Sequence, residues 1–134
     1  MKWYIIYIIV VALLHAAFAF CEMYPWSNPI LLTLVTKRLP VESGDDDVKK
    51  HKFSARHQPI VATIVHNAGV YNAILAAGLF WAAFRGEHGN EIALVLFIGA
   101  AVAGAFGTAT LQSPATALQG ILGIVGAILT IART

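Results

Sequence analysis

The sequence predicts an all-α integral membrane protein, a four-helix bundle whose helices run up-down-up-down. Of its 134 residues, 58% are hydrophobic and only 12% are charged, and the mean hydropathy is +0.72. A soluble domain carries about 25% charged residues, so most apolar side chains of this chain must face lipid. Four apolar stretches occupy most of the sequence, which predicts a single domain over residues 1–134.

Each of these four stretches is long enough to cross a hydrocarbon core of roughly 30 Å at about 1.5 Å per residue. The stretch nearest the N-terminus follows Lys2 and contains Ala17-Phe18-Ala19, as a secretory signal peptide with its cleavage site would. It is long for such a signal and three further stretches follow it, which favours an uncleaved first helix. The predicted spans are residues 3–21, 59–84, 92–111 and 115–132.

The predicted first loop, residues 22–58, is the longest polar segment. Pro25 ends the first helix, because proline cannot continue it. Residues 28–39 fit a short interfacial helix, with Asn28 as its N-cap and Pro29 at its first position. The acidic run 45–47 is interpreted as a solvated turn rather than a metal site, because lysines follow it closely.

The distribution of basic residues predicts the topology. Cytoplasmic loops carry an excess of Lys and Arg, so the first loop is expected in the cytoplasm and both termini outside. This topology fits a plasma membrane, or the inner membrane of a bacterium. The first loop carries Lys37, Arg38, Lys49, Lys50, Lys52 and Arg56, against Lys2, Arg85 and Arg133 on the other side.

Small residues recur at four-residue spacing in the last two predicted helices. Small side chains let helix backbones approach closely, which provides van der Waals contact in lipid. The pattern predicts tight packing within the bundle or between subunits, so a homo-oligomer stays open. The stripes are Gly99, Ala103 and Gly107; Ala100, Gly104 and Thr108; Gly123 and Ala127; and Gly126 and Thr130.

Polar side chains interrupt the spans mostly in the half that faces the first loop. Such groups are costly in lipid, so their placement on one side predicts a polar pocket. Asn67 and Tyr71 share one face of the second helix, while Asn72 lies on a different side. The alternative is that these groups are only interhelical hydrogen-bond partners. The candidate ligand-binding residues are His15, Glu22, Asn67, Tyr71 and Gln119.

The sequence predicts no metal site and no cofactor. His15, Glu22 and His66 could offer three ligands, but they lack the close spacing of a zinc motif. No nucleophile with a base and an orienting group is apparent, and no Gly-rich phosphate loop follows a strand. The net charge of +2, without a basic patterned face, gives no indication of nucleic-acid binding.

A series of short elements runs along the chain: His15, Glu22-Met23, Trp26, Asn67-x-Gly69-x-Tyr71-Asn72, Ala76-Ala77-Gly78, Trp81, Gly104-x-x-Gly107 and Gln119-Gly120. In these elements the chain resembles the family of small membrane proteins catalogued as domain of unknown function 1304. The resemblance implies a four-helix integral membrane fold whose molecular activity is not established. This chain departs from the family pattern at Leu14, where an acid often precedes the histidine, at Ala68, where glutamine is usual, and in a first loop extended around 45–52.

Three functions remain compatible with the sequence. The first is binding, or transport, of a lipid or small amphipathic molecule whose head enters the polar pocket. The second is a structural or interaction protein whose first loop binds a cytoplasmic partner. The third, favoured least, is a membrane enzyme that uses His15 or Glu22 as a general acid or base.

Overall fold

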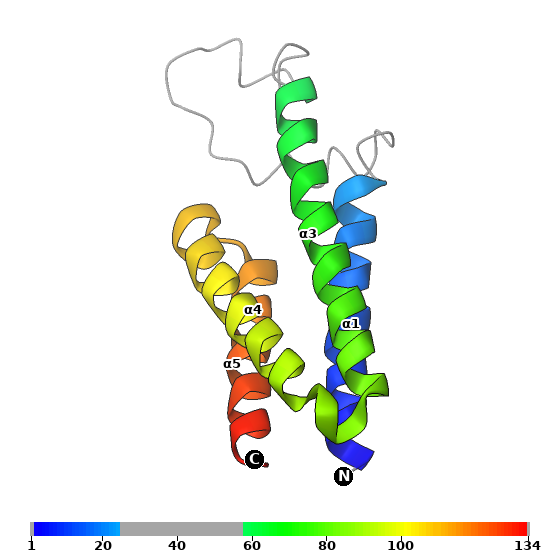
Figure 1. Cartoon of the computed structure of the whole chain (residues 1–134). Coiled ribbons are helices and arrows are strands. Elements are labelled where there is room, and N and C mark those ends of the chain that lie inside the picture. The colour runs from blue at the N-terminus through cyan, green and yellow to red at the C-terminus, as the bar shows by residue number, and fades with distance from the viewer. Residues whose placement is uncertain (1, 25–57, 134) are drawn as a thin grey trace. The chain divides into compact units, whose positions relative to one another are not determined.

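The computed structural model describes residues 2–24 and 58–133, and every regular element in this part of the chain is helical (Figure 1). Helix α1 spans Lys2–Met23, α3 spans Gln58–Phe84, α4 spans Asn90–Leu111 and α5 spans Pro114–Ile131. A short 3₁₀ helix, η2, covers Gly86–Gly89. The four predicted spans agree with these helices to within two residues at every end.

All four helices are long and apolar enough to cross a membrane, which confirms a multi-pass, all-α membrane protein. Helix α1 continues to Met23, so Glu22 lies in its last turn rather than in the first loop as expected. The predicted interfacial helix at 28–39 and the acidic run at 45–47 fall outside the described residues.

The chain divides into two compact units. One consists of Met1–Ala16 with Ala73–Thr134, and the other of Ala17–Asn72. The first unit therefore holds part of α1, part of α3, and all of α4 and α5. The second holds the end of α1 and the beginning of α3.

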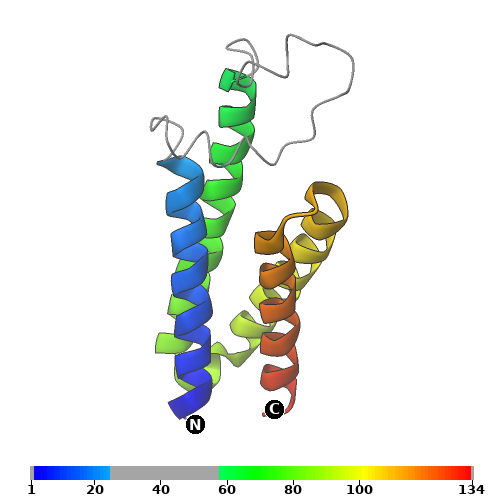
Figure 2. The same cartoon turned by 180° about the vertical axis from the view of Figure 1, so that it is seen from behind.

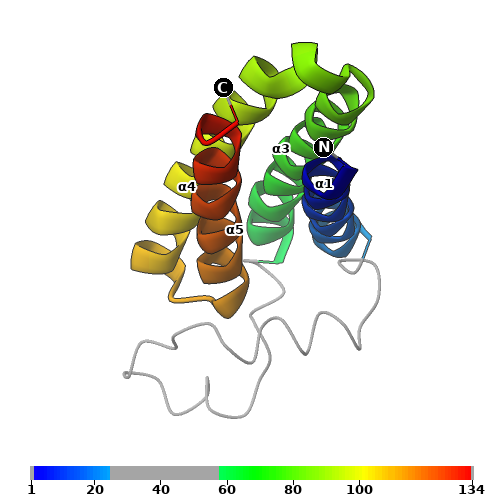
Figure 3. The same ribbon diagram turned by 90° about the horizontal axis from the view of Figure 1, so that it is seen from below.

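The first unit is a four-helix bundle around Phe97, whose side chain is fully buried. Viewed along the helices, α4 and α5 of this unit lie side by side (Figure 3). The N- and C-terminal ends of the chain lie at the same end of the unit, as alternating helix directions require (Figure 1). The helices contribute Tyr4, Ile8, Val11 and Ala12 from α1; Leu79, Ala82 and Ala83 from α3; Ala93 and Phe97 from α4; and the half-buried Leu122, Ala127 and Leu129 from α5.

Helices α4 and α5 form an antiparallel hairpin, and they lie side by side in Figure 2 as well as Figure 1. Gln112 turns the chain with a left-handed backbone at φ 50°, and Ser113 caps α5 by accepting the Ala115 N–H at 3.3 Å. Pro114 then occupies the first turn, where its missing N–H is not needed. The short predicted connection at 112–114 therefore produces antiparallel neighbours as expected.

A tyrosine joins α1 to α5 in the middle of this bundle. The Tyr7 hydroxyl donates a hydrogen bond of 2.7 Å to the Leu122 carbonyl oxygen. Its ring packs on Phe97 at 5.8 Å between centroids. The helical carbonyl thereby gains a second donor, and Tyr7 satisfies its polar group away from water.

Candidate functional site

The end of α1 and the start of α3 meet through a carboxyl–amide hydrogen bond. Asn72 donates from Nδ2 to Oε2 of Glu22 at 2.7 Å, and both side chains are partly buried. Both residues belong to segments that are apolar enough to cross a membrane. An ionisable group at such a position is costly unless another polar group satisfies it, so Asn72 stabilises Glu22 there.

Gly69 brings the two helices close enough for this bond. A Cβ atom added to Gly69 would lie 2.7 Å from Met23 Cγ, 3.2 Å from Glu22 Cβ and 3.3 Å from the Ala19 carbonyl oxygen. A side chain at this position would require the Met23 side chain to move aside and its other neighbours to shift by a few tenths of an ångström. Gly69 and Asn72 are three residues apart and share a helix face, so the glycine positions the amide beside the carboxyl group.

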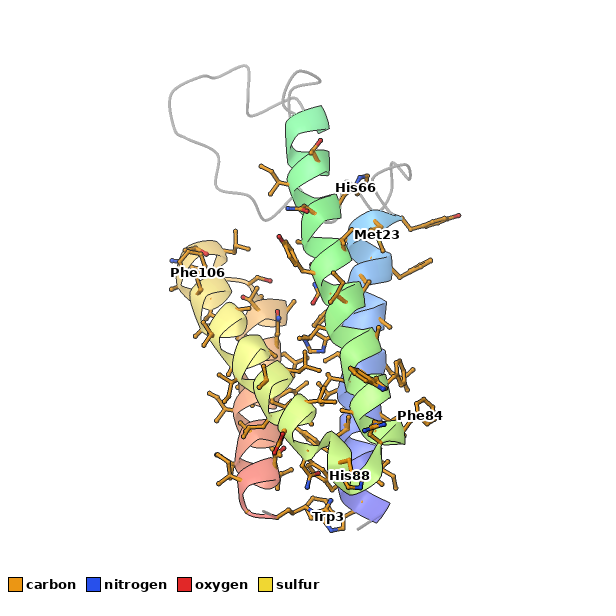
Figure 4. The ribbon with its side chains drawn as sticks, viewed as in Figure 1. Trp3, Met23, His66, Phe84, His88 and Phe106 are labelled. Atoms are coloured by element: carbon orange, nitrogen blue, oxygen red, sulfur yellow. The ribbon has the colours of Figure 1, made fainter. Side chains whose placement is uncertain are left out.

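Other polar residues of the same α3 segment lie at its surface. Asn67 and His66 are exposed, and Tyr71 is 66% exposed. Figure 4 labels His66 on α3 and Met23 on α1 in this unit. Asn67 and Tyr71 are four residues apart, so they form one exposed stripe that differs from the Gly69–Asn72 face.

We define the carboxyl–amide site as the hydrogen-bonded pair Glu22 and Asn72, both of which belong to the second unit. Asn67 and Tyr71 belong to the same unit but lie on a different face of α3. The pair offers acceptor oxygens from Glu22 and both donors and an acceptor from the Asn72 amide. Within the described residues, Asn72 is the one hydrogen-bond partner of the Glu22 carboxyl group. The Glu22 carboxyl group therefore keeps acceptor capacity for N–H or O–H donors of a bound molecule.

His15 and Gln119 belong to the first unit. His15 is fully buried, and its Nδ1 lies 2.9 Å from the Val11 carbonyl oxygen. A carbonyl can only accept, so this ring nitrogen carries the hydrogen. Gln119 is half-buried on α5. The prediction that both line one pocket with Glu22, Asn67 and Tyr71 stays a prediction.

Asn72 is not among the candidate residues that the sequence predicts. It lies on a different side of the helix from Asn67 and Tyr71, so their shared-face pattern does not select it. The available signal was Gly69, three residues earlier, because a glycine inside a membrane helix marks a face where another backbone approaches. The face of α3 that carries Gly69 and Asn72 contacts α1, whereas the Asn67–Tyr71 stripe is exposed.

The described part of the site offers hydrogen-bond donors and acceptors. Among residues 2–24 and 58–133, no three His, Cys, Asp or Glu side chains gather closely enough to hold a metal ion. Cys21, beside Glu22 in sequence, is exposed. Phe20 and Tyr24 stack at 5.0 Å between ring centroids, giving this end of α1 an exposed aromatic pair suited to the membrane interface.

Residues 42–131 match the model of a family described as "Protein of unknown function (DUF1304)". The chain belongs to this family. The DUF1304 match includes Asn67, Gly69, Tyr71 and Asn72, whereas Glu22 lies outside it. No curated protein and no solved structure matches the chain. Membership in DUF1304 agrees with the four-helix membrane fold and assigns no activity.

Proposed function

We propose that this protein binds a lipid or small amphipathic molecule through the carboxyl–amide site. The observation that carries the proposal is the 2.7 Å bond from Asn72 to Glu22 on helices of membrane-spanning character. A carboxyl group kept at this position by one amide retains acceptor oxygens. These oxygens suit a head group that carries amine or hydroxyl donors.

The exposed face of α3 supports the same proposal. Asn67 lies in the segment of α3 that is apolar enough to cross a membrane, nine residues and about 14 Å along the helix axis from the start of α3 at Gln58. A polar amide facing hydrocarbon is costly, so a polar group of another molecule or water must meet it. The polar head of an amphipathic molecule would meet the Asn67 amide, and the Tyr71 ring would offer it an amphipathic wall.

The apolar part of the ligand would lie on the exposed apolar surface of the same helix segment. Ile64 is 64% exposed and Val70 is 47% exposed, on either side of Asn67 in sequence. A molecule with one polar head and one apolar tail matches this combination. The predicted contributions of His15 and Gln119 stay predictions, because neither belongs to this unit.

Native mass spectrometry of protein extracted in a mild detergent tests the proposal. Wild type is compared with Glu22→Ala, Asn67→Ala and the control Val95→Ala, which removes an exposed apolar side chain of α4, outside the proposed site. We expect a discrete co-purifying mass in wild type and Val95→Ala, and its loss in the two polar variants. A bare single chain in all four samples, with unchanged helicity, would contradict ligand binding. A bare dimer that dissociates in Asn67→Ala would contradict it as well, because a second copy would then cover the amide.

A further inference from the structure

A second polar arrangement lies near the start of α1 and just past the end of α5, in the first unit. The Tyr4 ring is 1% exposed and its hydroxyl lies 2.6 Å from Thr130 Oγ1. Thr130 Oγ1 donates its only hydrogen to the Gly126 carbonyl oxygen at 2.7 Å, so Tyr4 is the donor in the first bond. The ring of Tyr4 is thereby held in a fixed orientation against α5.

Arg133 lies over the face of this fixed ring. Its guanidinium carbon is 4.4 Å from the Tyr4 ring centroid, within the range of a cation–π contact. The Arg133 backbone N–H also donates to the Thr130 carbonyl oxygen at 3.1 Å, which anchors the residue to the last turn of α5. The Tyr4–Thr130 pair therefore determines where both the backbone and the side chain of Arg133 lie.

The stacked guanidinium keeps its hydrogen-bonding capacity. A cation–π contact uses the face of the group, whereas its five N–H donors point outward in its plane. No carboxylate of the described residues pairs with Arg133, which is half-buried. A pre-oriented planar fork of this kind suits the two oxygens of a phosphate group.

The position of Arg133 identifies the source of that phosphate. It follows the end of α5 at Ile131 by two residues, at the depth where lipid head groups begin. Trp3, which is 56% exposed and packs edge-on to Tyr4 at 6.3 Å, lies at this end of the unit (Figure 4). An exposed tryptophan beside a fixed arginine is typical of the membrane–water interface.

We infer that Arg133, held on the Tyr4 ring, binds the phosphate of an anionic phospholipid. This site differs from the carboxyl–amide site: it belongs to the other unit, uses none of the same residues, and selects an anion instead of a donor-bearing head. The Arg133 guanidinium is held in one orientation, because Thr130 hydrogen-bonds both to the Tyr4 hydroxyl and to the Arg133 backbone N–H.

The matched control is Arg85, an exposed arginine of the same unit whose side chain has no ring contact or ion pair with another described residue. Full-length wild type, Arg133→Gln, Arg133→Lys and Arg85→Gln are placed in nanodiscs of mixed phosphatidylglycerol and phosphatidylcholine. The phosphatidylglycerol that stays bound after release into the mass spectrometer is then counted. A head-group contact of about 1 kcal/mol per arginine corresponds to about a fivefold loss of bound phosphatidylglycerol in Arg133→Gln.

The variants separate an oriented site from general charge. We expect Arg85→Gln to retain wild-type binding, and Arg133→Lys to lose part of it because lysine lacks the planar fork. Equal losses in Arg85→Gln and Arg133→Gln, or full retention in Arg133→Lys, would overturn the inference. Unchanged circular dichroism in all variants excludes unfolding as the cause. A phosphate adduct formed from inorganic phosphate in lipid-free detergent, and lost in Arg133→Gln, would support the site and identify free phosphate as a source.

Discussion

Gly104 of α4 and Gly120 of α5 touch backbone to backbone. A Cβ atom added to Gly104 would overlap the backbone of Gly120 and lie 2.8 Å from the Thr116 carbonyl oxygen. Gly123 meets the other helix in the same way, since its added Cβ would lie 2.7 Å from the Phe97 carbonyl oxygen. Where α4 meets α5, these small residues bring the two helix backbones into direct van der Waals contact.

Replacing Gly104 by alanine should destabilise the bundle by about 1–3 kcal/mol, the cost of forcing extra volume into a packed contact. Gly99 is the matched control on the same helix, because an added Cβ there meets nothing within 4 Å. Gly99→Ala should be neutral or stabilising by up to about 1 kcal/mol through helix propensity. Unfolding by denaturant in detergent micelles measures both free energies. Equal effects at the two positions would refute the backbone contact.

The Tyr4–Thr130 hydrogen bond should contribute about 0.6–2 kcal/mol to the free energy of unfolding, as interhelical bonds do in membrane proteins. Tyr4→Phe removes the donor, and Thr130→Val removes the acceptor. The double variant should be less destabilised than the sum of the two single variants, because both remove the same bond. Strict additivity in the same unfolding measurement would show that the two side chains do not interact.

The close approach of Gly69 to Glu22 makes this pair of positions suitable for an engineered disulfide. A Cβ atom built on Gly69 would lie 3.2 Å from Glu22 Cβ, close to the roughly 3.5–4.5 Å that disulfides require. In a Cys21→Ser background, Glu22→Cys with Gly69→Cys should oxidise readily, as judged by the loss of both free thiols in mass spectrometry. The control pairs Glu22→Cys with Val70→Cys, which is exposed. Oxidation of the control pair at the same rate would indicate a different approach of the two segments.

The excess of Lys and Arg in the first loop predicts that this loop is cytoplasmic. In a Cys21→Ser background, a membrane-impermeant maleimide should label His88→Cys on intact cells, because His88 is exposed in η2 between α3 and α4. Asp46→Cys in the first loop should react only after the membrane is permeabilised. The reverse labelling pattern would show that the first loop lies outside the cell and that η2 lies in the cytoplasm.

The fold follows closely from apolar length, and it was predicted for that reason. A span needs only enough consecutive apolar residues, and the resulting bounds are within two residues of the observed helices. The close packing of α4 on α5 was likewise evident from small residues at four-residue spacing. Which small residues meet α5 does not follow from the spacing, because the buried set takes members of both stripes. Ala100, Gly104 and Gly107 are buried, whereas Gly99, Ala103 and Thr108 are exposed.

The candidate site was predictable only in part. Glu22 stood out because a carboxyl group beside an apolar run is costly and needs a partner. The identity of that partner depends on the crossing of α1 and α3 at Gly69, which periodicity within a single helix does not determine. A shared helix face therefore points to Asn67 and Tyr71 but not to Asn72. The hydrogen bond to Glu22 is nevertheless made by Asn72.

The most direct test of amphipathic ligand binding is photo-crosslinking from position 71 in native membranes. Tyr71 is replaced by p-benzoylphenylalanine, and the control places the same group at Val95, which is 69% exposed on α4. Ligand binding predicts one dominant small-molecule adduct at position 71 that is lost when Glu22→Ala is added. Position 95 should give only a mixture of surrounding lipids. The same lipid mixture at both positions, unaffected by Glu22→Ala, would contradict the proposed function.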